Sequence, residues 1–90
     1  MTDDEIIAFL STLHGFKEVY SLRQFLCYRE AKSGHMQEVA VQIWDAGPFM
    51  DKGMRYHCYA KTDDGKSATG NPADTIHTAM SLVHWGNLDR

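Results

Sequence analysis

The segment from 71 to 86 constrains the fold most, because it carries the signals of a helix start, a buried helical face and a helix end. Asn71 is a favourable N-cap residue, and Pro72 falls at the first helical position, where its missing N–H costs nothing. The apolar residues that follow recur every three or four positions, as on the buried side of an amphipathic helix: Ile76, Ala79, Met80 and Val83. Gly86 is typical of the residue after a helix. The sequence therefore predicts a closing helix over 71–86.

The first residues predict a second amphipathic helix. Thr2 and Glu5 have the spacing of a capping box, in which each side chain satisfies a backbone amide of the other residue. The same apolar spacing as in the closing segment follows: Ile6, Phe9, Leu10 and Leu13. Gly15 ends the helix after His14. We therefore expect one helix at each end of the chain.

The residues between the helices predict strands. Segment 38–45 alternates, with Val39, Val41 and Ile43 on one face and Ala40, Gln42 and Trp44 on the other. Segment 55–61 predicts a further strand, a turn around Gly65 follows it, and 67–69 can add a short return strand. Segment 24–31 is rich in strand formers, but a helix over 17–29 remains an alternative.

Length and element order predict the fold class. The chain of 90 residues is long enough for one core and too short for two domains, so 1–90 is expected to be a single domain. The expected order is α-β-β-β-α. Two helices with one apolar face each need a shared surface to cover. The prediction is an α+β fold with an antiparallel sheet and both terminal helices packed on one face.

Several function classes have no support in the sequence. There is no apolar stretch long enough to span a membrane, and the acidic start lacks the pattern of a secretory signal, so a cytoplasmic protein is expected. Cys27 and Cys58 are expected to be buried free thiols. No metal-binding or catalytic motif joins the cysteines to the five histidines, so no cofactor, metal or enzymatic activity is expected. An enzyme with an unrecognised site is the third hypothesis.

The sheet suggests a binding surface, because both of its predicted faces carry large apolar side chains and two helices can cover only one. Trp44 and Tyr59 are expected on the open face, where the loop residues Phe49 and Met50 would extend them. Single aromatic residues on an open face are common in proteins without a partner. A contiguous aromatic patch is typical of an interface. The first hypothesis is a non-catalytic module that binds a protein partner, or itself, through these residues.

The middle of the chain resembles the double-stranded RNA-binding domain. Residues 28–30 are similar to the family's first strand, and Gly34 and His35 to the loop that follows it. The alternating 39–43 is similar to its second strand, and Gly70 to the entry to its last helix. The resemblance implies the topology of that family, as in small bacterial or phage proteins of this shape. The family grips phosphates with a lysine cluster at the start of its final helix, whereas 71–77 here has no lysine and one aspartate. The RNA-binding function is therefore not carried over.

Nucleic-acid binding is retained as the second hypothesis, with a loop as its main contact. The residues that could take part are Arg23, Arg29, Lys32, His35 and Arg55, of which Arg29, Lys32 and His35 surround the predicted loop. Affinity for nucleic acid depends on neutralising phosphates with cations. The formal net charge of −3 and the acidic first helix oppose this, so no nucleic-acid partner is expected.

Overall fold

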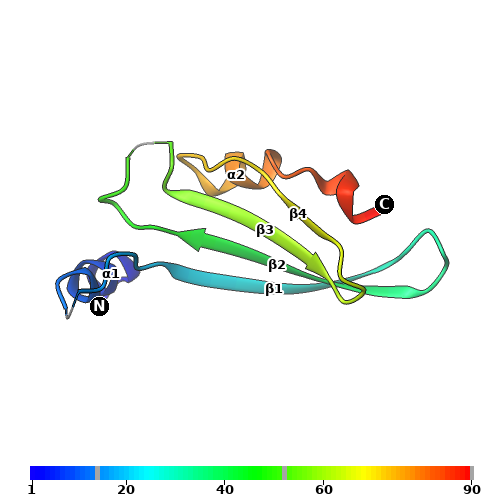
Figure 1. Ribbon diagram of the computed structural model, residues 1–90, viewed down its shortest axis with the longest axis horizontal. Coiled ribbons are helices and arrows are strands. Elements are labelled where there is room, and N and C mark those ends of the chain that lie inside the picture. Colours follow the sequence, from blue (N-terminus) through cyan, green and yellow to red (C-terminus); the bar gives the residue numbers. More distant parts are fainter. Residues whose placement is uncertain (14, 52, 90) are drawn as a thin grey trace.

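The computed structural model describes residues 1–13, 15–51 and 53–89 as one sheet with helices at its ends (Figure 1). The elements are α1 (Asp3–Ser11), β1 (Ser21–Glu30), β2 (Met36–Asp45), β3 (Tyr56–Thr62), β4 (Ser67–Thr69), α2 (Ile76–Ser81) and the 3-10 helix η1 (Trp85–Asp89). The strands are antiparallel and lie in the order β1-β2-β3-β4. The predicted α+β class and the α-β-β-β-α order are confirmed, with β4 as the short return strand.

Strand β1 resolves the alternative left open for 17–29 in favour of a strand. Its residues pair with β2 along their whole length, from Ser21 opposite Asp45 to Glu30 opposite Met36. The turn between the two strands contains Gly34 at a φ of 88°, which an L side chain rarely adopts. Cross-strand pairing with β2 therefore outweighs the apolar spacing that would have suited a helix.

The core lies between α2 and the face of the sheet that carries Val39 and Val41. It is completed by small and medium-sized residues of β3, β4, α2, η1 and the connections before and after α2: Cys58, Ala60, Ala68, Ala73, Ala79, Val83 and Leu88. Ala60 and Ala79 are fully buried, and their short side chains let α2 approach β3 closely. Gly70 is required for the same reason, because a Cβ there would lie 2.2 Å from the Leu82 carbonyl oxygen.

The predicted bounds of the closing helix are wrong at both ends. Thr75 is the N-cap, and its hydroxyl accepts a hydrogen bond from the Thr78 N–H at 3.1 Å. The residues before it are not helical, because Ala73 forms an isolated bridge with Tyr56 through two backbone hydrogen bonds of 2.9 and 3.0 Å. The helix ends at Ser81, and Gly86 lies within η1. This pairing with β3 outweighs the local start signal of the Asn-Pro pair.

Helix α1 begins as predicted but lies elsewhere than expected. The capping box is present, with the Glu5 N–H donating to Thr2 Oγ1 at 3.2 Å and the Thr2 N–H donating to Glu5 Oε1 at 3.1 Å. The helix ends at Ser11, and His14 lies outside the described residues. Figure 1 shows α1 beyond the end of the sheet at which β1 begins, whereas α2 packs along β3. The two helices therefore do not share one face of the sheet.

Close packing holds α1 in this position. Ile7 is its buried residue, and it contacts the connection after β2, where a Cβ on Gly47 would lie 2.8 Å from Ile7 Cγ2. The displaced helix makes the molecule elongated, with extents of 48 × 22 × 21 Å. Within the described residues, no helix has the length and apolar character needed to span a bilayer.

Candidate interaction surfaces

The open face of the sheet, turned away from α2, holds the predicted aromatic patch. Strand alternation buries Ile43 and Cys58 toward the core and turns Trp44 and Tyr59 to the opposite face. These two residues lie beside a hollow of about 570 Å³. Its wall also includes Tyr20, Met50, Met54 and His57. The structure therefore brings three of the four predicted partner-binding residues, Trp44, Tyr59 and Met50, around one hollow.

Trp44 is held in place by contacts on the sheet surface. Its ring meets Tyr20 edge to face, with centroids 5.5 Å apart and an interplanar angle of 75°. Its indole N–H donates to Gln42 Oε1 at 3.2 Å, and Gln42 Nε2 donates to Gln24 Oε1 at 2.8 Å. The polar edge of the indole is thus satisfied within the sheet. A ligand would meet an oriented ring that has no unpaired donor.

His57 contributes a polar group to the same hollow. The Thr69 hydroxyl donates its proton to the Cys58 carbonyl oxygen at 3.2 Å. The same hydroxyl lies 2.7 Å from His57 Nε2. The ring of His57 is thus held against β4 at the rim of the hollow.

Phe49 is the predicted site residue that the structure places elsewhere. Its side chain is 76% exposed, and it lines a smaller hollow of about 190 Å³ beside Ile7 and Val19. Met50, its neighbour, contributes to both hollows. Lys52, in the same loop, lies outside the described residues. Phe49 therefore belongs to the surface around α1.

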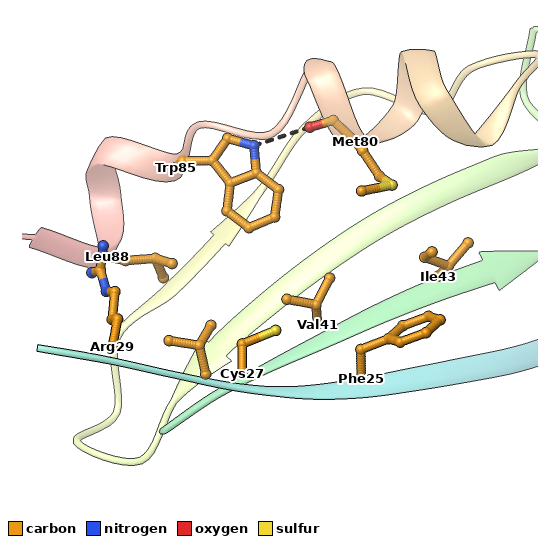
Figure 2. A pocket seen from close by; sticks show the side chains of 9 residues that line it. Phe25, Cys27, Arg29, Val41, Ile43, Met80, Trp85 and Leu88 are labelled. Carbon is orange, nitrogen blue, oxygen red and sulfur yellow. Dashed lines mark hydrogen bonds between the residues drawn. The ribbon is translucent and has the colours of Figure 1, made fainter. Parts of the chain in front are cut away.

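A second apolar hollow, which the sequence analysis missed, lies on the α2 side of the sheet (Figure 2). This α2-side groove has a volume of about 530 Å³ and is lined by Phe25, Cys27, Val41, Ile43, Met80 and Trp85, among others. The indole N–H of Trp85 donates to the Met80 carbonyl oxygen at 3.0 Å, as Figure 2 shows. The groove is open because α1 does not cover this face. The useful sequence signal was the apolar Phe25 on the same face as Val41.

The two cysteines differ, which corrects the expectation that both are buried. Both are free thiols, but Cys27 is exposed on β1 and Cys58 is 1% exposed in the core. Burial raises the pKa of the Cys58 thiol. His57, the neighbour of Cys58, faces the opposite side of the sheet. Strand geometry therefore separates this thiol from the nearest histidine in the sequence.

The basic loop residues lie together but are surrounded by acids. Arg29, Lys32 and His35 line a hollow of about 230 Å³ that also contains Asp64 and Asp89. Arg29 Nη2 lies 2.7 Å from Asp89 Oδ1, and Arg29 Nε donates to Gln37 Oε1 at 2.8 Å. A hydrogen bond from the Thr62 hydroxyl holds the pKa of Asp64 below its usual value. Lys66 lines the same hollow, so the two carboxylates offset most, but not all, of the positive charge of Arg29, Lys32 and Lys66.

Arg55, another residue of the nucleic-acid hypothesis, is also paired. It binds Asp45 through Nε at 2.8 Å and Nη2 at 3.1 Å, and Nη2 reaches Asp4 of α1 at 2.7 Å. Burial alone would raise the pKa of Asp45, but hydrogen bonds from Arg55 and from the Gly47 N–H outweigh it and lower the pKa. The same carboxylate raises the pKa of Arg55. Arg55 therefore connects α1 to the sheet at the edge of the open-face hollow.

Within 1–13, 15–51 and 53–89, no group of three or more His, Cys, Asp or Glu side chains is arranged to hold a metal ion. Comparison of the chain with protein families, with curated proteins and with solved structures found no match in any of the three. The two apolar hollows, one on each face of the sheet, are therefore the candidate sites of this protein.

Proposed function

We propose that this chain is a small non-catalytic interaction module that binds an apolar segment of a protein partner on the open face of its sheet. The observation that carries this proposal is the hollow that gathers Trp44, Tyr59 and Met50. Aromatic residues and methionine are enriched at protein interfaces, where charged residues are depleted from the centre. Polar groups of Glu18, Arg55 and His57 lie at the same hollow and suit its rim.

The contacts of Trp44 support binding at low entropic cost. A side chain already ordered in the free protein loses little rotamer freedom when a partner covers it. Tyr20 and Gln42 supply that order through the ring contact and the hydrogen bond described above. An apolar side chain of the partner would insert between Trp44 and Tyr59. We place this activity in the cytoplasm.

Nucleic-acid binding is the less favoured proposal. It would use Arg29, Lys32 and His35, but Arg29 is engaged with Asp89 and the loop contains Asp64. Phosphate binding gains its free energy from cations that neutralise phosphates and release counterions. We therefore propose that the likeness to the double-stranded RNA-binding domain concerns the order of elements and not RNA. We propose no enzymatic activity, since strand alternation separates Cys58 from His57.

The test is affinity capture from an extract of the source cells with the immobilised wild-type chain, Trp44→Ala and Phe25→Ala. Phe25 is the matched control, because it is an exposed aromatic residue of the same sheet that lines the α2-side groove. The proposal predicts proteins captured by wild type and by Phe25→Ala but lost from Trp44→Ala, with unchanged circular dichroism. Tyr59→Ala replaces Trp44→Ala if the latter unfolds. Capture that is lost only from Phe25→Ala, or no specific capture by wild type, would contradict it.

A further inference from the structure

The outer side of β1 is an unprotected sheet edge. β1 has ten residues and lies at the end of the strand order, and eight of its residues are exposed. Among the residues that the structure describes, Figure 1 shows no helix or strand along its outer side. Edge strands that remain unpaired are usually short, or carry a proline, a bulge or charged side chains. The charged residues of β1 are Arg23, Arg29 and Glu30, and its central residues 24–28 carry no charge. β1 has regular pairing with β2 and no proline, and Leu26 at its centre is 55% exposed.

The backbone groups available at this edge can be assigned from the ladder. The Ala31 N–H donates to the His35 carbonyl oxygen at 2.8 Å, which continues the β1–β2 register. In an antiparallel pair, alternate residues turn both backbone groups toward the same neighbour. Odd-numbered residues of β1 therefore bond β2. Leu26, Tyr28 and the other even-numbered residues present their N–H and C=O groups outward.

We propose that this edge pairs with β1 of a second copy, in an antiparallel register with Cys27 on the twofold axis. Leu26 of each copy then lies opposite Tyr28 of the other, and Gln24 lies opposite Glu30. These are the residues with outward backbone groups, so each pair exchanges two hydrogen bonds. The two sheets join into one continuous sheet, and this pairing is independent of the open-face hollow.

Side-chain chemistry selects this register over its neighbour. With Cys27 on the axis, Phe25 meets Arg29 and the apolar Leu26 meets the ring of Tyr28, so no like charges are opposed. A shift by two residues places Leu26 on the axis and sets Arg23 of one copy against Arg29 of the other. Like charges directly opposite each other destabilise a strand pair. The charges of β1 therefore favour the register centred on Cys27 over the one centred on Leu26. A register centred on Tyr28 would set the apolar Leu26 opposite the charged Glu30 instead of opposite an aromatic ring.

Cys27 reports on this pairing directly. On the axis it forms a non-hydrogen-bonded pair, in which Cα atoms lie about 4.5 Å apart. That spacing falls within the range of disulfide bonds. Cys27 is exposed, whereas Cys58 is buried and cannot reach another molecule in the folded chain. Mild oxidation with copper–phenanthroline should thus link two copies through Cys27.

The experiment compares dimer formation by sedimentation with disulfide cross-linking of the full chain. Leu26→Pro removes an outward N–H without removing a bond to β2, and Leu26→Ala is its matched control because it keeps that N–H. We expect a concentration-dependent dimer that cross-links in wild type, Leu26→Ala, Cys58→Ser and Trp44→Ala. Cys27→Ser should lose only the cross-link, and Leu26→Pro should lose both the dimer and the cross-link.

A charge pair keeps the test decisive if Leu26→Pro unfolds. Gln24→Lys places a cation opposite Glu30 of the other copy and should strengthen the dimer, whereas Gln24→Lys combined with Glu30→Lys should weaken it. A wild-type chain that sediments as a monomer at every concentration would overturn the inference. So would a dimer that survives in the folded Leu26→Pro variant or is unaffected by both charge variants. A dimer lost from Trp44→Ala but kept in Leu26→Pro would assign self-association to the open face.

Discussion

Replacing Arg55 with methionine should destabilise the fold by separating α1 from the sheet. Arg55 is held by two hydrogen bonds to Asp45 and one to Asp4, and its side chain is 25% exposed. Hydrogen bonds to charged groups contribute about 1.5–3 kcal/mol in partly buried sites, whereas exposed ion pairs contribute about 0–1 kcal/mol. Asp45 is the more buried partner, and Asp4 is 46% exposed. Methionine keeps most of the apolar contact and removes the charge.

The expected loss is about 2 kcal/mol in the free energy of unfolding, most of it from Asp45. For a domain of this size, such a loss lowers the melting temperature by roughly 10 °C. Denaturant titration and thermal melts at pH 7 measure both quantities. Asp4→Asn is the matched control and should cost only about 0.5 kcal/mol, because its pair with Arg55 is exposed.

The pH dependence gives a second readout of the same contact. The pKa of Asp45 is lower in the folded chain than in the unfolded chain, so its contribution is present at neutral pH. That contribution is lost as the pH falls below about 4, the pKa of an aspartate in the unfolded chain, and then through the lower pKa of Asp45 in the folded chain. The difference in stability between wild type and Arg55→Met should therefore shrink in acid. Equal stability of the two proteins at pH 7, or a difference unchanged at low pH, would refute the reasoning.

Three further predictions concern the closing helix and the basic loop. Thr75→Ala should lower the free energy of unfolding by about 1 kcal/mol because it removes the N-cap, whereas Asn71→Ala should lower it far less. Denaturant midpoints of the two variants test this, and a larger loss in Asn71→Ala would show that the helix begins at Asn71. Gly70→Ala should lower the free energy of unfolding by more than about 2 kcal/mol, because the added Cβ would collide with the Leu82 carbonyl oxygen. A melting temperature equal to that of wild type would contradict this. A duplex RNA of about 20 base pairs should show no saturable binding near physiological salt, because Arg29 is paired with Asp89 and Asp64 lies at the same hollow. Salt-sensitive binding in a polarisation titration would reverse the order of the two proposed functions.

Local patterns predicted the strands and the open face well. The alternation of Val39, Val41 and Ile43 identified β2 and, with it, the side on which Trp44 lies. The capping box at Thr2 is another local signal, and it is present as predicted. These features depend on residues near one another in the chain. Sequence reasoning could therefore find them without knowing the tertiary structure.

The errors come from contacts between distant segments. Asn71 and Pro72 form a strong local helix start, but the pairing of Ala73 with Tyr56 keeps that segment extended. The position of α1 depends on the close approach of Ile7 to Gly47 and on the ion pairs of Arg55. No spacing rule reports these contacts. The α2-side groove was missed for the same reason, because its opening follows from where α1 lies.

The two tryptophans allow the most direct measurement of open-face binding. The indole N–H of Trp44 lies on the open face and that of Trp85 at the α2-side groove, so each gives its own NMR signal, assigned with Trp44→Phe. The measurement adds the partner segment found by capture to the ¹⁵N-labelled chain and follows both signals. Binding on the open face predicts a saturable shift of the Trp44 signal and of the Tyr59 amide, with Trp85 unchanged. A shift of Trp85 with Trp44 unchanged would contradict the account and assign binding to the α2-side groove.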